Sequence, residues 1–230
     1  EHLGIAFGMG LTAEKVAQRW QIGREAQDAF AVASNQKACA AIAAGHFRAE
    51  TTPYPVTTHQ PDLAGGQVLT RTRTVCDDEG PRADASLQSL GKLKPVFHAR
   101  GSVTAGNSSQ MSDGAGAVLL VSEQVLKDYN LTPLARFAGY AVGGVAPEIM
   151  GIGPAPAIQL LLERAGLKLD DIGRFEINEA QGAQTLAVGR ELGLDLNRLN
   201  VNGGAIALGH PLAATGVRLT ITLAREMKRS

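Results

Sequence analysis

The sequence predicts an α/β fold, and three observations lead to that prediction. After residue 134, strand-like segments alternate with helix-like segments, as they do in layered α/β proteins. An apolar run at residues 116–122 predicts a further strand, and Ser122 is suited to begin the helix that follows it. Near the start of the chain, two segments have apolar residues three and four positions apart, which is typical of helices.

The two helical segments near the start cover residues 12–20 and 23–47. Residues 51–95 lose this periodicity and are rich in Pro, Thr, Asp and Arg, so we expect a loop-rich excursion there. Glycines and small polar residues at 104–117 predict a turn ahead of the apolar strand. The alternating segments of the second half cover residues 134–144, 155–166, 174–180, 184–192, 203–209 and 214–227.

The composition argues against several classes of function. The chain has 230 residues with 22 basic and 22 acidic side chains, so no charge surplus would attract nucleic acid or an anionic membrane. No apolar run approaches the roughly 20 residues that span a bilayer, and no basic leader precedes a long apolar region. We therefore expect a cytoplasmic protein without a membrane span.

The two cysteines, Cys39 and Cys76, lie far apart and in no metal-ligand spacing. This pattern favours a reducing compartment and argues against a disulfide framework and a structural metal site. Cys39 falls in an Ala-rich helical pattern, where burial as a small apolar side chain is expected. Cys76 lies beside Asp77 and Asp78, whose negative charges disfavour a thiolate. Neither cysteine is expected to act as a nucleophile.

The stretch NVNGGAIALGHPLAATG, residues 200–216, places one His-Pro pair in a run of glycines and small aliphatic residues. Glycine lets the backbone approach other groups closely, because it has no side chain and tolerates positive φ. His210 stands just before a predicted helix and is a candidate general base or oxyanion donor. The alternative is an ordinary loop histidine with satisfied hydrogen bonds. The glycines match neither the dinucleotide nor the P-loop spacing, so a nucleotide site is not expected.

The stretch INEAQGAQ, residues 177–184, contains Asn178 at the end of a predicted strand. Open α/β sheets bind ligands at the carboxyl ends of their strands, where an amide can hold a water or donate to an oxyanion. The alternative is that Asn178 caps the helix that follows. The small polar residues at 104–117 would suit the lining of a narrow tunnel, with a plain Gly-rich turn as the alternative.

Taken together, these segments resemble the thiolase family. The resemblance rests on MGLTAEKVAQRW (9–20), GSVTAGNSSQMSDGAGAVLLVSE (101–123), IMGIGPAPAI (149–158), INEA (177–180) and NVNGGAIALGHPLAATGVR (200–218). These motifs occur in the family's order and spacing and cover nearly the whole chain. Several motifs in one order are far more specific than any one of them.

The resemblance implies the thiolase fold, with five layers in the order α-β-α-β-α. Two related α/β halves make up this fold, and a loop domain is inserted in the first half. The resemblance assigns residues 1–10 to the end of the first part of the N-terminal half, the rest of which is missing, and residues 11–100 to the loop domain. Residues 101–132 correspond to the last part of the N-terminal half, and residues 133–230 to an incomplete C-terminal half. The junction between Gly4 and Ile5 is shorter than the family pattern.

The resemblance also implies an acyltransferase of fatty-acid metabolism. In this family a cysteine attacks the 3-keto group of a 3-ketoacyl-CoA, acetyl-CoA leaves, and the acyl group passes to free CoA; the reverse reaction is a Claisen condensation. Carried onto this sequence, His210 would deprotonate that cysteine and donate to the thioester oxygen, and Asn178 would hold the water of the oxyanion site. Ser109 would meet the pantetheine arm of CoA, and Met150 would line the acyl pocket. CoA and acyl-CoA are substrates, and neither a separate cofactor nor a metal is implied.

The sequence departs from the family pattern at several points. Neither the nucleophilic cysteine nor the acid-base cysteine of the family is present. Gln181 and Gly182 replace a Phe-Ala pair, and Ala213 stands where Gly is common. The alternative function is therefore a non-catalytic thiolase-like fragment that binds CoA or a partner subunit. The resemblance implies a homodimer or homotetramer and leaves open a β-oxidation partner subunit.

Overall fold

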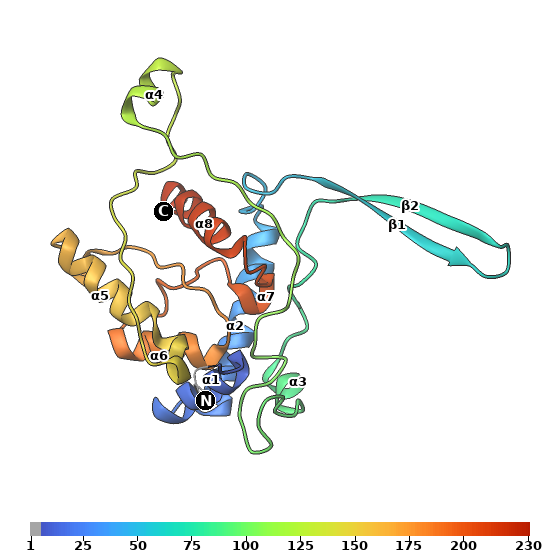
Figure 1. The fold of residues 1–230 in the computed structure, drawn as a ribbon, viewed down its shortest axis with the longest axis horizontal. Helices are drawn as coiled ribbons and strands as arrows, with labels where there is room; N and C mark the ends of the chain where they lie inside the picture. Colours follow the sequence, from blue (N-terminus) through green and yellow to red (C-terminus); the bar gives the residue numbers. More distant parts are fainter. Residues whose placement is uncertain (1–5) are drawn as a thin grey trace.

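The computed structural model describes residues 6–230, and most of its regular elements are helices (Figure 1). The helices are α1 (Met9–Arg19), α2 (Arg24–Ala43), α3 (Leu87–Gly91), α4 (Glu123–Asp128), the 3-10 helix η1 (Pro147–Ile152), α5 (Pro154–Ala165), the 3-10 helix η2 (Leu169–Asp171), α6 (Gly182–Leu192), α7 (Ala205–Leu208) and α8 (Thr215–Arg229). The strands are β1 (Tyr54–Asp62) and β2 (Gln67–Val75). The junction between Gly4 and Ile5 lies outside the described residues. None of the helices described is long and apolar enough to cross a membrane.

The helices that periodicity predicts are present. The segment expected at 23–47 is α2, which ends earlier than expected, and Gly45 follows it with a φ of +74° that a helix cannot continue through. Ser122 begins α4 as expected, because its hydroxyl oxygen accepts the Val125 N–H at 3.3 Å. In α5, α6 and α8 the residue spacing likewise predicts the element correctly.

The main core lies where α1, η1, α5 and α6 meet. Val16 of α1 and Val188 of α6 are fully buried there, together with Leu199 from the segment after α6. Small side chains on α6, such as Ala183 and Ala187, let the neighbouring elements approach closely. The core therefore fixes the N-terminus of α6, which follows the INEA motif.

One short parallel pairing stands at the centre of this body. The Phe175 N–H donates to Arg198 O at 3.0 Å, and the Asn200 N–H donates to Phe175 O at 2.9 Å. The side chain of Asn200 extends the pairing, because its Oδ1 accepts the Ile177 N–H and its Nδ2 donates to Ile177 O. This pairing fixes the segment that ends at Asn178.

Residues 51–95 were expected to be loop-rich, and here the expectation is partly wrong. Strands β1 and β2 form an antiparallel hairpin from the Tyr54–Val75 pair to the Asp62–Gln67 pair. The hairpin projects well away from the body (Figure 1). Nearly all of its side chains are exposed on both faces, so it lacks the apolar alternation by which half-buried strands are recognised.

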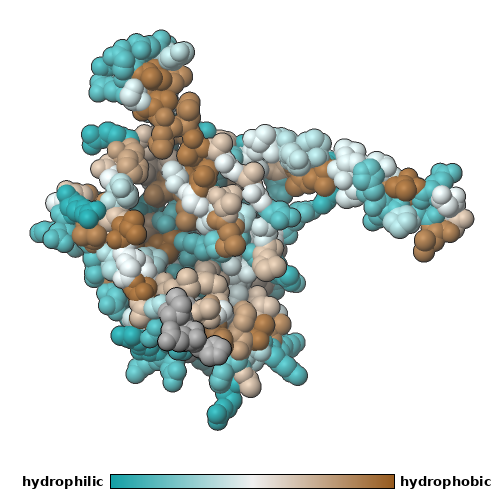
Figure 2. Space-filling model, viewed as in Figure 1, coloured by the Kyte–Doolittle hydropathy of each residue, from teal (hydrophilic) through white to brown (hydrophobic). Residues whose placement is uncertain are grey.

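The strands expected at 116–122 and 134–144 are also not formed. The strand-like segment at 203–209 is instead a helix, α7, and the one at 174–180 pairs only at Phe175 in the part of the chain that the structure describes. Within the described residues, residues 116–121 and 134–144 make no backbone hydrogen bonds to other segments. An apolar run becomes a strand only when a neighbouring strand pairs with it. Large apolar side chains on these segments are exposed, including Leu119 at 81% and Phe137 at 69%. Figure 2 shows brown, apolar side chains along the two chain segments that lead to and from α4.

Candidate active site

His210 lies between α7 and α8 and is held at both its backbone and its ring. Its N–H donates to Gln110 O at 3.1 Å, and its Nδ1 is 2.7 Å from Thr215 Oγ1. The Thr215 hydroxyl donates its single proton to Pro211 O at 2.9 Å. With its own proton on Pro211 O, the Thr215 oxygen is placed to accept a proton from the histidine Nδ1, and in that tautomer the lone pair of a neutral ring lies on Nε2. Such a nitrogen can take a proton from a substrate or a nucleophile.

The environment keeps the His210 ring neutral. Burial of the imidazole, followed by the positive charge of Arg218, lowers the pKa of His210 below its ordinary value. A lowered pKa increases the fraction of the ring that is a base at neutral pH.

The glycine run before His210 lets the backbone pack tightly against other elements. A Cβ on Gly203, whose φ is +80°, would lie 2.7 Å from Ser34 O on α2. A Cβ on Gly204 would lie 2.2 Å from the Cδ of Glu179. At Gly209, with a φ of +91°, a Cβ would overlap the side chain of Ser112. Close approach requires glycine at all three positions, and the positive φ of Gly203 and Gly209 favours glycine there as well.

Asn178 does not cap the following helix, so the capping alternative is wrong. The residue at the N-cap of α6 is Gln181, and its side chain makes no capping hydrogen bond. The Oδ1 of Asn178 is buried and has no hydrogen-bond partner among the described residues. Asn178 also lines a cavity of about 300 Å³ beside α5. A buried amide oxygen without a partner is suited to hold a water or a ligand donor.

Glu176 lines the same cavity as Asn178. Burial raises its pKa to about 8, even though Arg218 lies 3.3 Å away and lowers it. This carboxyl group therefore carries a proton over much of the neutral range.

Ser109 lies between the segments of Asn178 and His210. Its N–H donates to Ala180 O at 3.0 Å, and the next carbonyl, Gln110 O, accepts the His210 N–H. The Gly182 N–H donates to Asn107 O at 2.8 Å on the same stretch. The structure thus brings the segments of three predicted site residues together through backbone hydrogen bonds.

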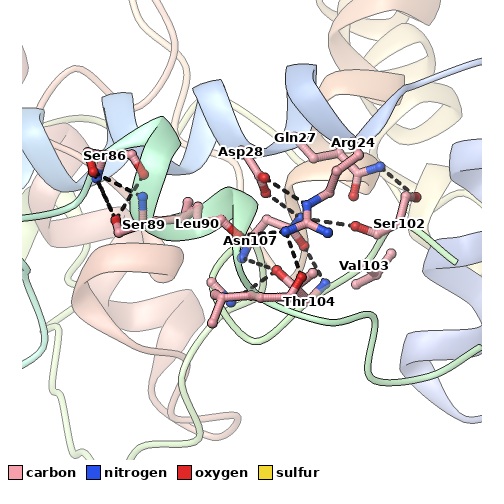
Figure 3. A network of polar contacts seen from close by, with 12 residues as sticks. Arg24, Gln27, Asp28, Ser86, Ser89, Leu90, Ser102, Val103, Thr104 and Asn107 are labelled. Carbon is pink, nitrogen blue, oxygen red and sulfur yellow. Dashed lines mark hydrogen bonds and ion pairs between the residues drawn. The ribbon is translucent and has the colours of Figure 1, made fainter.

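A buried polar network holds this stretch in place (Figure 3). Asn107 is fully buried, and its Nδ2 donates to Asp28 Oδ1 at 2.9 Å while its Oδ1 accepts the Thr104 N–H at 2.8 Å. The second oxygen of Asp28 accepts from Arg24 Nε at 2.7 Å. Arg24 also donates to the carbonyl of Leu90, at the end of α3. The network connects α2, α3 and the Ser109 stretch.

Met150 lies outside this group. It belongs to η1, which packs on α1 and α6, and its side chain is 46% exposed. It does not line the cavity that Asn178 and Glu176 share.

The positions that depart from the family pattern have different surroundings. Gln181 is buried, and its backbone pairs with Ser108. A Cβ at Gly182 would lie 3.2 Å from Gln27 O, so an alanine there requires a small shift of the backbone. Ala213 is exposed, and its methyl group displaces nothing buried.

The cysteines have no evident part in this site. Both thiols are free; Cys39 is half-buried and Cys76 is exposed, so the burial expected for Cys39 is met only in part. Within residues 6–230, His, Cys, Asp and Glu side chains form no cluster suited to a metal ion.

Three residues of the site were not found from the sequence. Thr215 directs the proton of His210, while Glu179 and Asn200 join the Asn178 segment to the glycine run. The nearest sequence signal is the position of Glu179, beside Asn178 at the end of a strand-like segment. The contacts of Glu179 and Asn200 join residues that are far apart in the sequence, and no local pattern reveals them.

Comparison with known proteins places these features in context. Residues 5–124 match the family model described as Thiolase, N-terminal domain, and residues 131–230 match Thiolase, C-terminal domain. The 3-ketoacyl-CoA thiolase of Bacillus subtilis (strain 168) is 49% identical over an alignment of 229 residues, and the match covers 97% of this chain and 57% of that protein. The acetyl-CoA acetyltransferase of Pseudomonas aeruginosa is 51% identical over 223 residues, 97% of this chain and 54% of that protein.

Solved structures of thiolases and acetyltransferases are also similar to this chain. The crystal structure of the Bacillus anthracis acetyl-CoA acetyltransferase has a TM-score of 0.90 and 44% identity, over 96% of this chain and 54% of that one. The crystal structure of human mitochondrial 3-ketoacyl-CoA thiolase in complex with CoA has a TM-score of 0.89 and 46% identity, over 98% of this chain and 54% of that one. The chain spans about half the length of the relatives it matches, and over that half it has their mixed α/β fold.

Proposed function

Because this chain belongs to the thiolase family, we propose that it carries the histidine and the asparagine of an acyltransferase acting on 3-ketoacyl-CoA and CoA. One observation carries the proposal. A histidine whose Nδ1 lies 2.7 Å from the Thr215 hydroxyl is on one side of the Ser109 stretch, and an asparagine with an unpartnered Oδ1 among the described residues belongs to the segment on the other. The first is suited to proton transfer, and the second is suited to hold a water beside an oxyanion.

In the proposed reaction, Nε2 of His210 removes the proton of a thiol, which then attacks C3 of the 3-ketoacyl-CoA. The bond between C2 and C3 breaks, the acyl group stays on the thiol, and the carbanion of acetyl-CoA takes a proton from the acid-base cysteine that the family resemblance implies in another part of the protein. The thiol of free CoA gives its proton to that cysteine and attacks the thioester, and the released thiolate takes its proton back from His210. Protonated His210 and a water held by Asn178 donate to the thioester oxygen of the substrate, which takes up negative charge as the bond between C2 and C3 breaks.

The attacking thiol is expected from another part of the protein. Cys39 is half-buried within α2, and Cys76 lies just beyond the hairpin. Within the part of the chain that the structure describes, neither cysteine is hydrogen-bonded to His210.

The finer family features stay proposals for this chain. CoA is the proposed substrate, because a relative at 46% identity was solved in complex with CoA. Ser109 is placed at the pantetheine arm and Met150 at the acyl chain. The five-layered arrangement, the boundaries at residues 10, 100 and 132, a homodimer or homotetramer, a β-oxidation partner and a cytoplasmic location also remain predictions.

An acid-quench experiment tests the proposed function. The whole protein, including the part from which the attacking thiol is expected, is purified and mixed with acetoacetyl-CoA. The mixture is quenched with acid after a short time, and the intact mass of the protein is measured by mass spectrometry. We expect an added acetyl group on the wild type and a loss of about 10²- to 10⁴-fold in its rate of formation in the variant His210→Ala. The matched control is His59→Ala, which changes an exposed histidine of the hairpin and should leave the rate unchanged.

Two outcomes would contradict the proposal. One is an adduct that forms equally fast in His210→Ala. The other is a wild-type protein that binds CoA saturably and never gains an acetyl group, which would favour the non-catalytic CoA-binding function instead.

A further inference from the structure

Glu179 is a buried carboxylate to which the reaction above assigns no role. Its side chain is 1% exposed. Its Oε2 accepts from Ser34 Oγ at 2.7 Å and from the Ile206 N–H at 3.2 Å, and its Oε1 accepts from Asn200 Nδ2 at 2.8 Å. Burial raises the pKa of Glu179, while these hydrogen bonds act in the opposite direction. The surroundings thus offer the carboxylate donors at both oxygens.

Asn200 is held in a conformation that supports this contact. Its φ is +44°, in the left-handed region that asparagine tolerates better than most residues. Its side chain contacts the backbone of Ile177 through both the N–H and the C=O. Asn200 therefore joins the strand-like segment before Asn178 to the carboxylate of Glu179.

The other oxygen of Glu179 contacts the glycine run. It accepts from the first turn of α7, which ends two residues before His210. Ser34 Oγ, which donates to it, accepts the Gly204 N–H at 3.1 Å. The missing side chain of Gly204 leaves the room that the carboxylate occupies. One buried carboxylate thus contacts both segments that lead to the proposed catalytic residues.

We propose that Glu179 is a positioning residue, which together with Asn200 fixes the segment of Asn178 relative to the segment that ends at His210. The proposal rests on the acyl-transfer role proposed above for those two residues. A glutamine cannot replace the carboxylate here, because its amide nitrogen would face either Asn200 Nδ2 or the donors of Ser34 and Ile206. Either arrangement sets two donors against each other.

The test compares Glu179→Gln with the matched control Glu14→Gln. The Glu14 carboxylate accepts the N–H groups of Ser102 and Val103 at 2.9 Å, and it makes no hydrogen bond to the segments of Asn178 or His210. Two properties are measured: thiolysis of acetoacetyl-CoA, and the rate at which diethyl pyrocarbonate modifies His210. The modification is followed by mass spectrometry of peptides, with exposed His59 as the internal reference.

We expect Glu179→Gln to lower kcat about 10- to 100-fold with little change in KM, as misplacement of a catalytic group does. The modification rate of His210 should rise several-fold relative to His59, because the ring is less firmly held. Glu14→Gln should lower the melting temperature and leave both readouts unchanged.

A double substitution, which exchanges the carboxylate and the amide of this contact and is called the reversed pair, provides a second variant. In Glu179→Gln with Asn200→Asp, the glutamine amide can donate to the new carboxylate, although the bond to Ile177 O is lost. We expect partial recovery of kcat and of the slow modification of His210 relative to Glu179→Gln alone.

The proposal is overturned if Glu179→Gln lowers the melting temperature as Glu14→Gln does but leaves kcat and the reactivity of His210 unchanged. It is also overturned if the reversed pair recovers nothing. A wild-type protein without thiolysis would refute the proposed function alone, because the modification rates of His210 still show whether Glu179 positions that ring.

Discussion

We expect the hydroxyl group of Thr215 to determine which nitrogen of His210 carries the proton, and the substitution Thr215→Val tests this directly. Valine keeps the shape of the side chain and replaces the hydroxyl group with a methyl group. The Pro211 carbonyl stays satisfied, because it also accepts the N–H groups of Ala214 and Thr215 at 2.9 Å. The loss therefore falls on the Nδ1 proton of His210, which is left without its acceptor.

The expected loss of stability in Thr215→Val follows from the burial of these groups. Leaving one donor unsatisfied costs about 1–3 kcal/mol when it is fully buried, and the half-buried His210 places this change near the lower end. For a chain of this length, about 1 kcal/mol lowers the melting temperature by about 2–4 °C. Nitrogen-15 NMR of the ring should show the proton on Nδ1 in the wild type and on a mixture of both nitrogens in Thr215→Val.

The control is Thr215→Ser, which keeps the hydroxyl group and should keep the proton on Nδ1. The reasoning would be refuted by a neutral wild-type ring with its proton on Nε2. It would equally be refuted if the valine and serine variants had the same distribution of ring protons.

Three other predictions concern packing and charge. Gly204→Ala should lower the free energy of unfolding, measured in urea, by about 3 kcal/mol or more, because its Cβ would overlap buried Glu179. The control Gly216→Ala meets no atom within 4 Å and should be neutral or slightly stabilising. Equal losses of stability in the two variants would contradict this prediction. Glu176 has a folded pKa of about 8 against an ordinary value of 4.5, so the folded state binds more protons between these values and stability should fall by roughly a few kcal/mol as the pH rises through this window. Glu176→Gln should flatten that dependence in urea titrations at several pH values, and an unchanged slope would show that another group causes it. Leu119 is 81% exposed, so Leu119→Thr should reduce binding of the dye ANS and aggregation in light scattering, and no change would mean that this side chain is covered in solution.

The sequence predicts the helices better than the strands, for a physical reason. A helix such as α5 or α6 satisfies its backbone within itself, so apolar residues three and four positions apart suffice to locate it. The apolar run at 116–122 has the composition of a strand, but a strand forms only with a partner, and the described chain pairs none with it. The hairpin of β1 and β2 shows the reverse case, because its strands pair with each other and bury neither face.

Some residues of the candidate site can be predicted from the sequence and others cannot. His210 and Asn178 can be predicted, because a glycine run beside one and a predicted strand end before the other are local patterns that indicate a functional site. Glu179 acquires its role only through folding, since the side chain of Ser34 that donates to it is 145 residues away. Asp28 and Asn107 are 79 residues apart and likewise meet only once the Ser109 stretch has packed against α2. Contacts of this kind depend on tertiary structure and leave no local pattern.

The projecting hairpin also has a practical consequence. Its turn, residues 63–66, lies at the tip, far along the hairpin from the body (Figure 1), and Leu63 is 93% exposed. Loop tips of this kind tolerate insertions, because no buried backbone group depends on them. An affinity tag or a fluorescent label placed in this turn would therefore report on the molecule while leaving the surroundings of His210 untouched.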